Sequence, residues 1–228
     1  MNRLLLILVA LVGALVGGLL VWGFGRHGDE ALVRRTLVAH PDILTDAMAA
    51  LQEREQGKLV AAAGKALTVP VGNAYAGNPR GDVSVVEFFD YNCGYCRASL
   101  PVVVALVKAD PNVRIVYREL PILAPSSQAA ARASLAAARQ GRWPAFHDAL
   151  YGGGHVTDAT IAAAAARTGV ELSAAASAQN DAEITRNLKA ASDLGLTGTP
   201  SWVIGNRVLS GALPLEELQK AIATARAR

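Results

Sequence analysis

The chain opens on an apolar stretch that contains no charge. No residue from Leu4 to Gly25 is charged, and as an α-helix this stretch would be roughly 33 Å long at about 1.5 Å per residue. Because that length is enough to cross a bilayer, we expect residues 1–28 to form a membrane-spanning anchor or a signal segment. No convincing small-x-small cleavage site follows, which favours a retained anchor over a cleaved signal.

Residues 29–57 show the pattern of an amphipathic helical arm. Apolar side chains recur at spacings of three, four and seven positions, namely Val33, Leu37, Leu44, Met48 and Leu51. The pair His40-Pro41 interrupts the pattern, so we expect two short amphipathic helices. Such an arm can pack on the main domain as a spacer. Alternatively, its apolar stripe can meet the same stripe of another copy and form a homo-oligomer.

The compact part of the chain, residues 58–228, begins with a strand–helix–strand pattern. Val83–Phe89 is rich in β-branched and aromatic residues, which is typical of a fully buried strand, and a helical segment follows at 98–109. Residues 112–120 alternate between apolar and polar side chains and end at Pro121, so they predict a second strand. Two strands joined by a helix in this way are parallel, with a right-handed crossover.

An alanine-rich helical block occupies about residues 125–196. Leu, Phe and Ile interrupt the alanines at helical spacing, and glycines or Ser, Thr and Asp caps separate the segments, so four or five helices are expected. Residues 201–204 and 207–210 then predict a hairpin with a Gly-Asn turn, and residues 215–226 predict a closing helix. The chain is therefore expected to be an α/β protein whose sheet carries an inserted helical domain.

Composition and charge narrow the choice of partners. Hydrophobic residues make up 52% of the 228 residues and charged residues 18%, which fits a globular protein with an added apolar segment. The net charge is only +3, and the basic residues are scattered, so nucleic acid is not an expected partner. No strand leads into a glycine-rich loop of the phosphate-binding kind, so no cofactor is expected.

The two cysteines of the chain are Cys93 and Cys96, which stand at the junction of the first strand and its helix. At a helix N-terminus, free backbone N–H groups and the positive end of the helix dipole stabilise a thiolate. The thiolate is the species that attacks disulfides, so Cys93 is the candidate nucleophile. Cys96 lies one helical turn further and faces the same way, so it is placed to resolve a mixed disulfide.

Other roles for the two thiols are less well supported. A zinc site needs two further ligands, and the four histidines, His27, His40, His147 and His155, do not form a second ligand pair, so no metal is expected. A purely structural disulfide would close a loop too short to restrain the unfolded chain much. We expect His147 to be a surface or packing residue of a helix, because no motif places it beside the cysteines.

These residues resemble the DsbA-type thioredoxin-fold thiol-disulfide oxidoreductases. The resemblance rests on Glu87-Phe88-Phe89 leading to Cys93–Cys96, on the helical block, and on Gly198–Ser201 before the hairpin, and it covers about residues 78–228. The segment FFDYNCGYC with a preceding helical region is similar to the ScsC and Com1-like subgroup. This resemblance implies a thioredoxin fold with an inserted helical domain, and some members of the subgroup are oligomers built through the N-terminal region.

The resemblance also implies roles for single residues. Thr199-Pro200 matches the cis-proline loop that lies against the cysteine pair and offers backbone groups to an extended substrate. Glu87 matches the buried acid below the disulfide, a candidate proton acceptor for Cys96. Gly94 and Tyr95 occupy the positions that tune the redox potential. Because this dipeptide differs from the Pro-His of strongly oxidising members, the direction of exchange (oxidase, isomerase or reductase) stays open.

The expected function is disulfide exchange with exported protein substrates outside the cytoplasm, in the periplasm if the chain is tethered to an inner membrane by residues 4–25. A membrane redox partner that reoxidises or reduces the pair is implied as well. The alternative is a membrane-tethered binding module that uses the thiols to hold a soft metal such as Cu(I).

Overall fold

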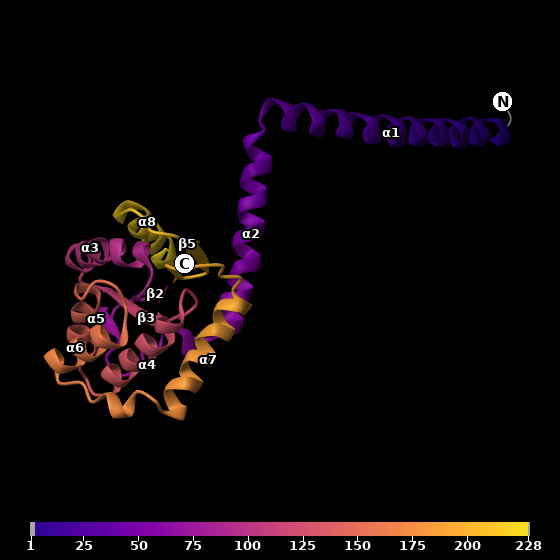
Figure 1. Cartoon of the computed structure of the whole chain (residues 1–228). Helices are drawn as coiled ribbons and strands as arrows, with labels where there is room; N and C mark the ends of the chain where they lie inside the picture. Colours follow the sequence, from indigo (N-terminus) through magenta and orange to yellow (C-terminus); the bar gives the residue numbers. More distant parts are fainter. Residues whose placement is uncertain (1–2, 228) are drawn as a thin grey trace. The chain divides into compact units, whose positions relative to one another are not determined.

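The computed structural model describes residues 3–227, and within that range the side chains of residues 3–6, 20, 21 and 23–29 are not described. The chain divides into two compact units, Met1–Gln52 and Glu53–Arg228. The first unit holds helix α1 (Arg3–Ala39) and the beginning of helix α2 (Asp42–Ala63), both labelled in Figure 1. The second unit holds the sheet and all later elements.

The apolar N-terminal stretch is helical. The helix that contains it, α1, continues past the last residue of the apolar stretch. Over the described residues, no helix combines the length and the apolar character that a membrane crossing needs. The membrane-spanning helix expected over residues 4–25 thus has no support from the structure. Residues 4–6, 20, 21 and 23–25 of that stretch are among those whose side chains are not described.

The prediction of two short helices within residues 29–57 is wrong about the length of both helices. The break at His40-Pro41 is confirmed, because α1 ends at Ala39 and α2 begins at Asp42. However, the first helix is continuous with the apolar stretch, and the second continues past the expected end to Ala63. Gly57 lies inside α2, since a single glycine costs a helix only about 1 kcal/mol relative to alanine and does not have to end it.

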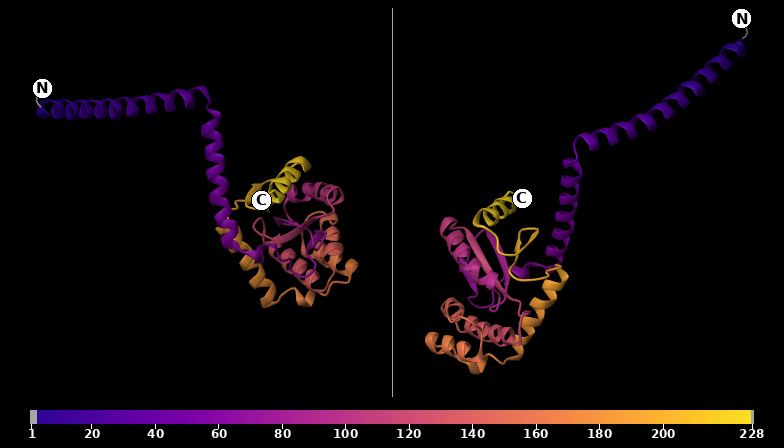
Figure 2. Two further views of the ribbon diagram at one scale, coloured as in Figure 1. Left: turned by 180° about the vertical axis from the view of Figure 1, so that it is seen from behind. Right: turned by 45° about the horizontal axis from the view of Figure 1, so that its top comes forward.

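The second unit is built on one mixed sheet of five strands in the order β1-β3-β2-β4-β5, seen from two further sides in Figure 2. The strands are β1 (Tyr75–Gly77), β2 (Val83–Phe89), β3 (Val113–Glu119), β4 (Ser201–Ile204) and β5 (Arg207–Ser210). β2 and β3 are parallel, with Val83 opposite Val113, and every other neighbouring pair is antiparallel. The predicted parallel pair and the predicted hairpin are confirmed, whereas β1 was not predicted.

The alternation of side chains along the central strands sorts the core onto two faces of the sheet. Val85 and Phe89 of β2 belong to a large cluster that includes residues of α3 (Gly94–Ala109) and α8 (Leu215–Arg226). Val86 and Phe88 belong to a second cluster with Leu67 of the 3₁₀ turn η1 (Lys65–Thr68) and with residues of α7 (Ala178–Asp193). Both faces are therefore covered, as the continuous apolar character of Val83–Phe89 predicts.

The helical block lies between β3 and β4, as expected from the alanine-rich sequence. It contains α4 (Pro125–Arg139), α5 (Trp143–Gly152), α6 (Asp158–Thr168), the short turn η2 (Leu172–Ala174) and α7. Nine of the fifteen residues of α4 are buried, and its seven alanines allow neighbouring helices to approach closely. The domain boundaries inferred from the sequence, at about residues 28, 57 and 125–196, stay predictions.

A buried ion pair ties the chain before the sheet to the helical block. The Arg118 guanidinium donates to Glu183 Oε1 at 2.7 Å and to the carbonyl oxygens of Leu67 and Val69 at 3.0 and 2.6 Å. The Arg118 and Glu183 side chains are only 6% and 8% exposed. Arg118 therefore holds β3, the η1 segment and α7 together from one buried position.

Replacing Arg118 by methionine is expected to lower the free energy of unfolding by about 3 kcal/mol, because it leaves buried carbonyl groups without their donor and removes one of the two arginines that pair with the buried Glu183 carboxylate. The matched control is Lys189→Met, which breaks the exposed Lys189–Asp193 pair and should change stability by less than about 0.5 kcal/mol. Urea unfolding of both variants measures the difference. Equal losses in the two variants would contradict the role of Arg118.

Candidate active site around Cys93 and Cys96

The cysteine pair lies where β2 passes into α3. Cys93 is the N-cap of α3, with extended backbone dihedrals of φ −81° and ψ 114°. The Cys96 backbone N–H donates to Cys93 Sγ at 3.3 Å, so the first sulfur occupies the place of a capping side chain. A negative charge on this sulfur faces the unpaired N–H groups of the first turn, which is where a helix stabilises an anion best.

The loop before β4 meets this sulfur from the other side. The Thr199–Pro200 peptide bond is cis, as expected from the sequence. The Cys93 thiol donates to the Thr199 carbonyl oxygen at 3.1 Å. The structure thus brings together residues that lie 106 positions apart in the chain, and it places the proline loop directly against the candidate nucleophile.

Glu87 lies below the pair on the sheet face that α3 covers. It shares this face with Val85 and Phe89, and it is 3% exposed. Burial raises the pKa of the Glu87 carboxyl to about 8, and a negative charge on Cys93 raises it in the same direction. The buried position expected from the sequence is confirmed, and the raised pKa lets this acid take up or release a proton near neutral pH.

The two thiols have different surroundings. Burial raises the pKa of the Cys96 thiol far above its ordinary range, and the charge of Glu87 acts in the same direction. Cys96 is 1% exposed, whereas Gly94 and Tyr95 between the cysteines are exposed, Tyr95 by 70%. Cys93 is 5% exposed, so it is the more accessible of the two sulfurs, and Cys96 needs a proton acceptor before it can react.

Asp90, which the sequence analysis did not single out, organises the turn that carries Cys93. Its carboxylate accepts from the Asn92 backbone N–H at 2.8 Å and from the Ser127 hydroxyl at 2.7 Å. It also accepts from the backbone N–H groups of Ile122 and Leu123 at 2.9 and 3.0 Å. Asp90 is 1% exposed, so these four donors replace water around a buried carboxylate.

The backbone of Asp90 also contributes to the site, because its carbonyl accepts from the Cys93 N–H at 3.0 Å and from the Tyr151 hydroxyl at 3.2 Å. Asp90 therefore links the cysteine turn to the β3–α4 connection and to the helical block. The only signal in the sequence was an aspartate directly after a buried strand, and that signal is not specific.

Replacing Asp90 by alanine is expected to lower the free energy of unfolding by about 3 kcal/mol, because several buried donors lose their acceptor. We expect slower disulfide exchange as well, since the turn that holds Cys93 is no longer fixed. Thermal unfolding and insulin reduction measure the two effects. The control is Asp193→Ala, which removes an exposed carboxylate. A loss of stability as small as that of the control would contradict this prediction.

The sequence predicted that His147 is either a surface residue or a packing residue of a helix. The structure shows a buried packing residue. The ring stacks on Trp143 with centroids 4.2 Å apart, and Nδ1 lies 3.1 Å from the Tyr91 hydroxyl. Burial lowers the pKa of His147 to about 3, so the ring is neutral at physiological pH. Its place in an aromatic cluster, which also contains Phe89 and Tyr117, supports the helical block beneath the site.

A third buried acid and a basic residue complete the surroundings of the turn. Glu119 stands opposite Phe89 in the β2–β3 register and is 3% exposed, and burial raises the pKa of its carboxyl well above the ordinary range. Arg97 donates to the carbonyl oxygens of Tyr151 and Gly154 at the C-terminal end of α5, which connects α3 to that helix end. Neither residue was predicted, because both roles depend on contacts between distant segments.

A strand that ends in a CxxC turn at a helix N-terminus, with a cis-proline loop against the first sulfur, defines a thioredoxin-type redox fold, here with a helical insertion. The sequence profile of the DSBA-like thioredoxin domain matches residues 84–223. The chain belongs to this family. A second profile, the copper resistance protein ScsC N-terminal domain, matches residues 30–58.

Solved structures agree with this assignment. A thioredoxin-like oxidoreductase from Silicibacter pomeroyi is 44% identical and covers 68% of this chain and 92% of that one, with a TM-score of 0.65. ScsC of Proteus mirabilis in a transitional conformation is 29% identical over 89% of this chain and 95% of its own, with a TM-score of 0.68. A periplasmic thioredoxin-like protein from Salmonella enterica serovar Typhimurium is 28% identical over 73% and 97%, with a TM-score of 0.66.

Two curated relatives are much longer proteins. The Na(+)/H(+) antiporters NhaA 1 of Salinispora arenicola and NhaA 3 of Salinispora tropica are each 31% identical to this chain over 150 residues. The match covers 63% of this chain, and the chain spans only 23% of the length of these relatives. The likeness therefore concerns one segment of the antiporter chains.

Proposed function

We propose that the chain is a thiol-disulfide oxidoreductase that exchanges disulfides with exported proteins through Cys93 and Cys96. The observation that carries this proposal is the position of Cys93 Sγ, which caps α3 and contacts the Thr199 carbonyl at 3.1 Å. Membership of the DSBA-like family supports the same reaction. The proposal goes beyond family membership in two points: the CGYC motif is the redox centre, and the substrates are exported proteins.

In the reductive direction, the Cys93 thiolate attacks one sulfur of a substrate disulfide, and the other substrate sulfur leaves as a thiolate that takes a proton. Cys96 then transfers its proton to Glu87 and attacks Cys93 Sγ. The Cys93–substrate bond breaks, and the second substrate sulfur leaves as a thiolate that takes a proton from water. The substrate gains two electrons and the protein holds a Cys93–Cys96 disulfide. In the oxidative direction the same steps run backwards.

We also propose roles for the residues around the pair, as the family resemblance implies. Thr199 and Pro200 would present backbone groups to an extended substrate chain beside Cys93, and Gly94 and Tyr95 would tune the redox potential as the exposed residues of the turn. Glu87 would hold the proton of Cys96 during resolution, since its raised pKa of about 8 makes it a base of suitable strength.

The direct test is transfer of a disulfide between the full chain and a peptide with two cysteines, followed by mass spectrometry in both directions. Transfer at a rate well above that of glutathione alone is expected. Equilibration with glutathione buffers gives the reduction potential, and that value separates a donor of disulfides from a reductase or isomerase. Failure to transfer in either direction would overturn the proposal.

The proposed place of action is outside the cytoplasm. A solved neighbour, 28% identical to this chain, is described as periplasmic, and disulfide exchange between proteins is typical of oxidising compartments. The uncharged residues 4–25 would direct the chain into the export route, as a signal or an anchor. A membrane redox partner would then return the cysteine pair to its starting state.

We also propose that the arm over residues 29–57 joins copies of the chain. The ScsC N-terminal profile covers residues 30–58, and the apolar side chains of Leu44, Met48 and Leu51 are exposed by 58%, 64% and 53%. An exposed apolar stripe along a helix is a typical surface for association with another helix.

The double variant Leu44→Glu, Leu51→Glu is therefore expected to convert an oligomer into monomers, because the charges make burial of the stripe costly. The matched control is Thr45→Glu, Gln52→Glu, which adds the same charge at neighbouring polar positions of α2. Light scattering of the full chain measures the mass. An unchanged mass in the first variant, or equal dissociation in both, would contradict the proposed arm.

A further inference from the structure

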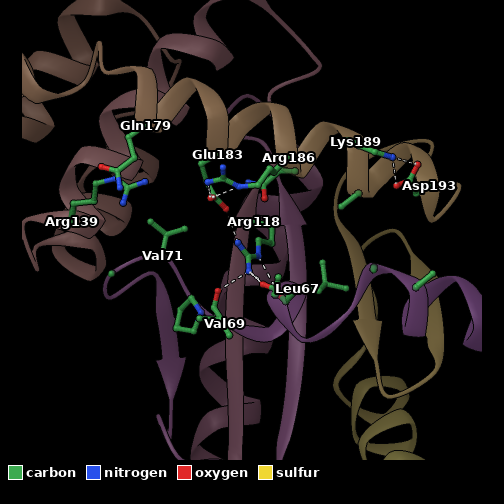
Figure 3. A pocket seen from close by; sticks show the side chains of 17 residues that line it. Leu67, Val69, Val71, Arg118, Arg139, Gln179, Glu183, Arg186, Lys189 and Asp193 are labelled. Atoms are coloured by element: carbon green, nitrogen blue, oxygen red, sulfur yellow. Dashed lines mark hydrogen bonds and ion pairs between the residues drawn. The ribbon is translucent and has the colours of Figure 1, made fainter.

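A cavity of the second unit lies away from the cysteine pair, on the sheet face that carries Val86 and Phe88. It has a volume of about 680 Å³ and is bounded by α7 on one side and by residues 62–72 on the other (Figure 3). Apolar side chains, among them Leu67, Val69 and Val71, form much of its lining. Both the volume and the apolar lining are in the range of small-molecule sites.

The walls of this cavity are held in place by strong local contacts. Arg118, which lies in the cavity in Figure 3, binds the carbonyl groups of Leu67 and Val69 and so holds the lower wall. Gly72 has a φ of +51°, and a Cβ at this position would lie 2.0 Å from the Ala138 carbonyl oxygen, so the chain passes very close to the end of α4. A cavity with fixed walls binds a ligand without first ordering its site.

The charges around the cavity do not cancel. The lining includes four basic side chains and two acidic ones: Arg118, Arg139, Arg186, Lys189, Glu183 and Asp193. Lys189 pairs with Asp193, and Glu183 pairs with both Arg118 and Arg186. Arg139 donates through Nε to the Asn180 amide oxygen at 2.9 Å and forms no ion pair with any residue that the structure describes. Two positive charges therefore remain after internal pairing, and they favour an anion.

A buried amide in the lining points in the same direction. Asn187 is 4% exposed and lines the cavity. Among the described residues, its side-chain amide makes no hydrogen bond, and its nitrogen and oxygen are not fully buried. An unbonded amide in the lining of a cavity can both donate to and accept from a bound ligand. The cavity is the direction from which such a partner can come.

We propose that this cavity binds an amphipathic anion, that is, an apolar molecule with a carboxylate or sulfonate group and a hydrogen-bonding group in its body. Arg139 at the end of α4 contacts the acid group. The apolar body lies over Val69, Val71 and Leu67, and Asn187 hydrogen-bonds to the polar group of the ligand. This function is separate from disulfide exchange, because none of the proposed redox residues lines the cavity.

The experiment uses the full chain and the fluorescent probe 1-anilinonaphthalene-8-sulfonate, which has apolar rings, one sulfonate and one N–H. Saturable binding of one probe per chain is expected. The blocking variant Ala190→Trp should abolish this component, because Ala190 lines the cavity. Arg139→Gln should raise the dissociation constant about tenfold, the effect of one charge-assisted hydrogen bond. The control Arg167→Gln removes an exposed charge of α6 that does not line the cavity and should leave binding unchanged.

Displacement by small amphiphiles tests the class of ligand. Decanoate should displace the probe, whereas decyltrimethylammonium, with the same chain length and the opposite charge, should not. Equal displacement by both would overturn the anion specificity. Unchanged binding in Ala190→Trp, equal behaviour of the two arginine variants, or no saturable binding would overturn the site. If Ala190→Trp fails to fold, as judged by lost disulfide exchange, the two arginine variants still decide.

Discussion

Replacing Cys93 by serine is expected to slow disulfide exchange by at least about a hundredfold, because a hydroxyl group at this position is not ionised at neutral pH and does not attack a disulfide. The hydroxyl keeps the capping position at α3, so the fold should persist. Insulin reduction measures the rate, and thermal unfolding shows that the variant is folded.

The companion variant Cys96→Ser separates attack from resolution. It keeps the nucleophile and lacks the resolving thiol, so a mixed disulfide between Cys93 and substrate should accumulate and be visible on non-reducing gels. The double variant should form no such adduct. Equal rates of wild type and Cys93→Ser would contradict the proposed enzyme and favour a binding module in which the two thiols hold a soft metal.

Replacing Glu87 by glutamine is expected to remove a loss of stability that wild type suffers as pH rises. The carboxyl has an ordinary value of 4.5 and a pKa of about 8 in the folded chain, with burial as the main cause. Between these values the unfolded chain releases the proton while the folded chain keeps it, so the free energy of unfolding falls with rising pH. The loss is complete above pH 8 and amounts to at most about 5 kcal/mol, since each pKa unit corresponds to about 1.4 kcal/mol.

Urea unfolding at several pH values from 5 to 9 tests this expectation. The difference in stability between Glu87→Gln and wild type should grow with pH in favour of the variant, whereas the exposed control Glu216→Gln should follow wild type throughout. A constant difference would contradict the raised pKa. If Glu87 also accepts the proton of Cys96, the variant should resolve mixed disulfides more slowly at neutral pH, although it is the more stable protein.

Local patterns were enough to predict most of the sheet. Val83–Phe89 and the hairpin around the Gly-Asn turn appear where they were expected, because a run of β-branched residues and a two-residue turn limit the backbone within a few positions. The CGYC turn was predicted for the same reason, since a strand and a helix on either side leave little freedom to four residues. β1 was missed because three residues carry no usable periodicity.

The helical ends were harder to predict because an α-helix continues until something stops it. Pro41 ended α1 as expected, but Gly57 did not end α2. A proline removes a backbone donor and clashes with the preceding turn, whereas a glycine only raises the free energy of the helix slightly.

The sequence by itself determined the two thiols, their spacing and the elements that hold them, since these depend on neighbours along the chain. The family resemblance implied that Thr199 lies against Cys93, and the structure shows this contact. Only the tertiary structure decided that Asp90 accepts four hydrogen bonds and that a cavity forms beside Arg118. Each of these features requires segments tens of residues apart to meet. Such meetings are set by how the two faces of the sheet are covered, and no local pattern records them.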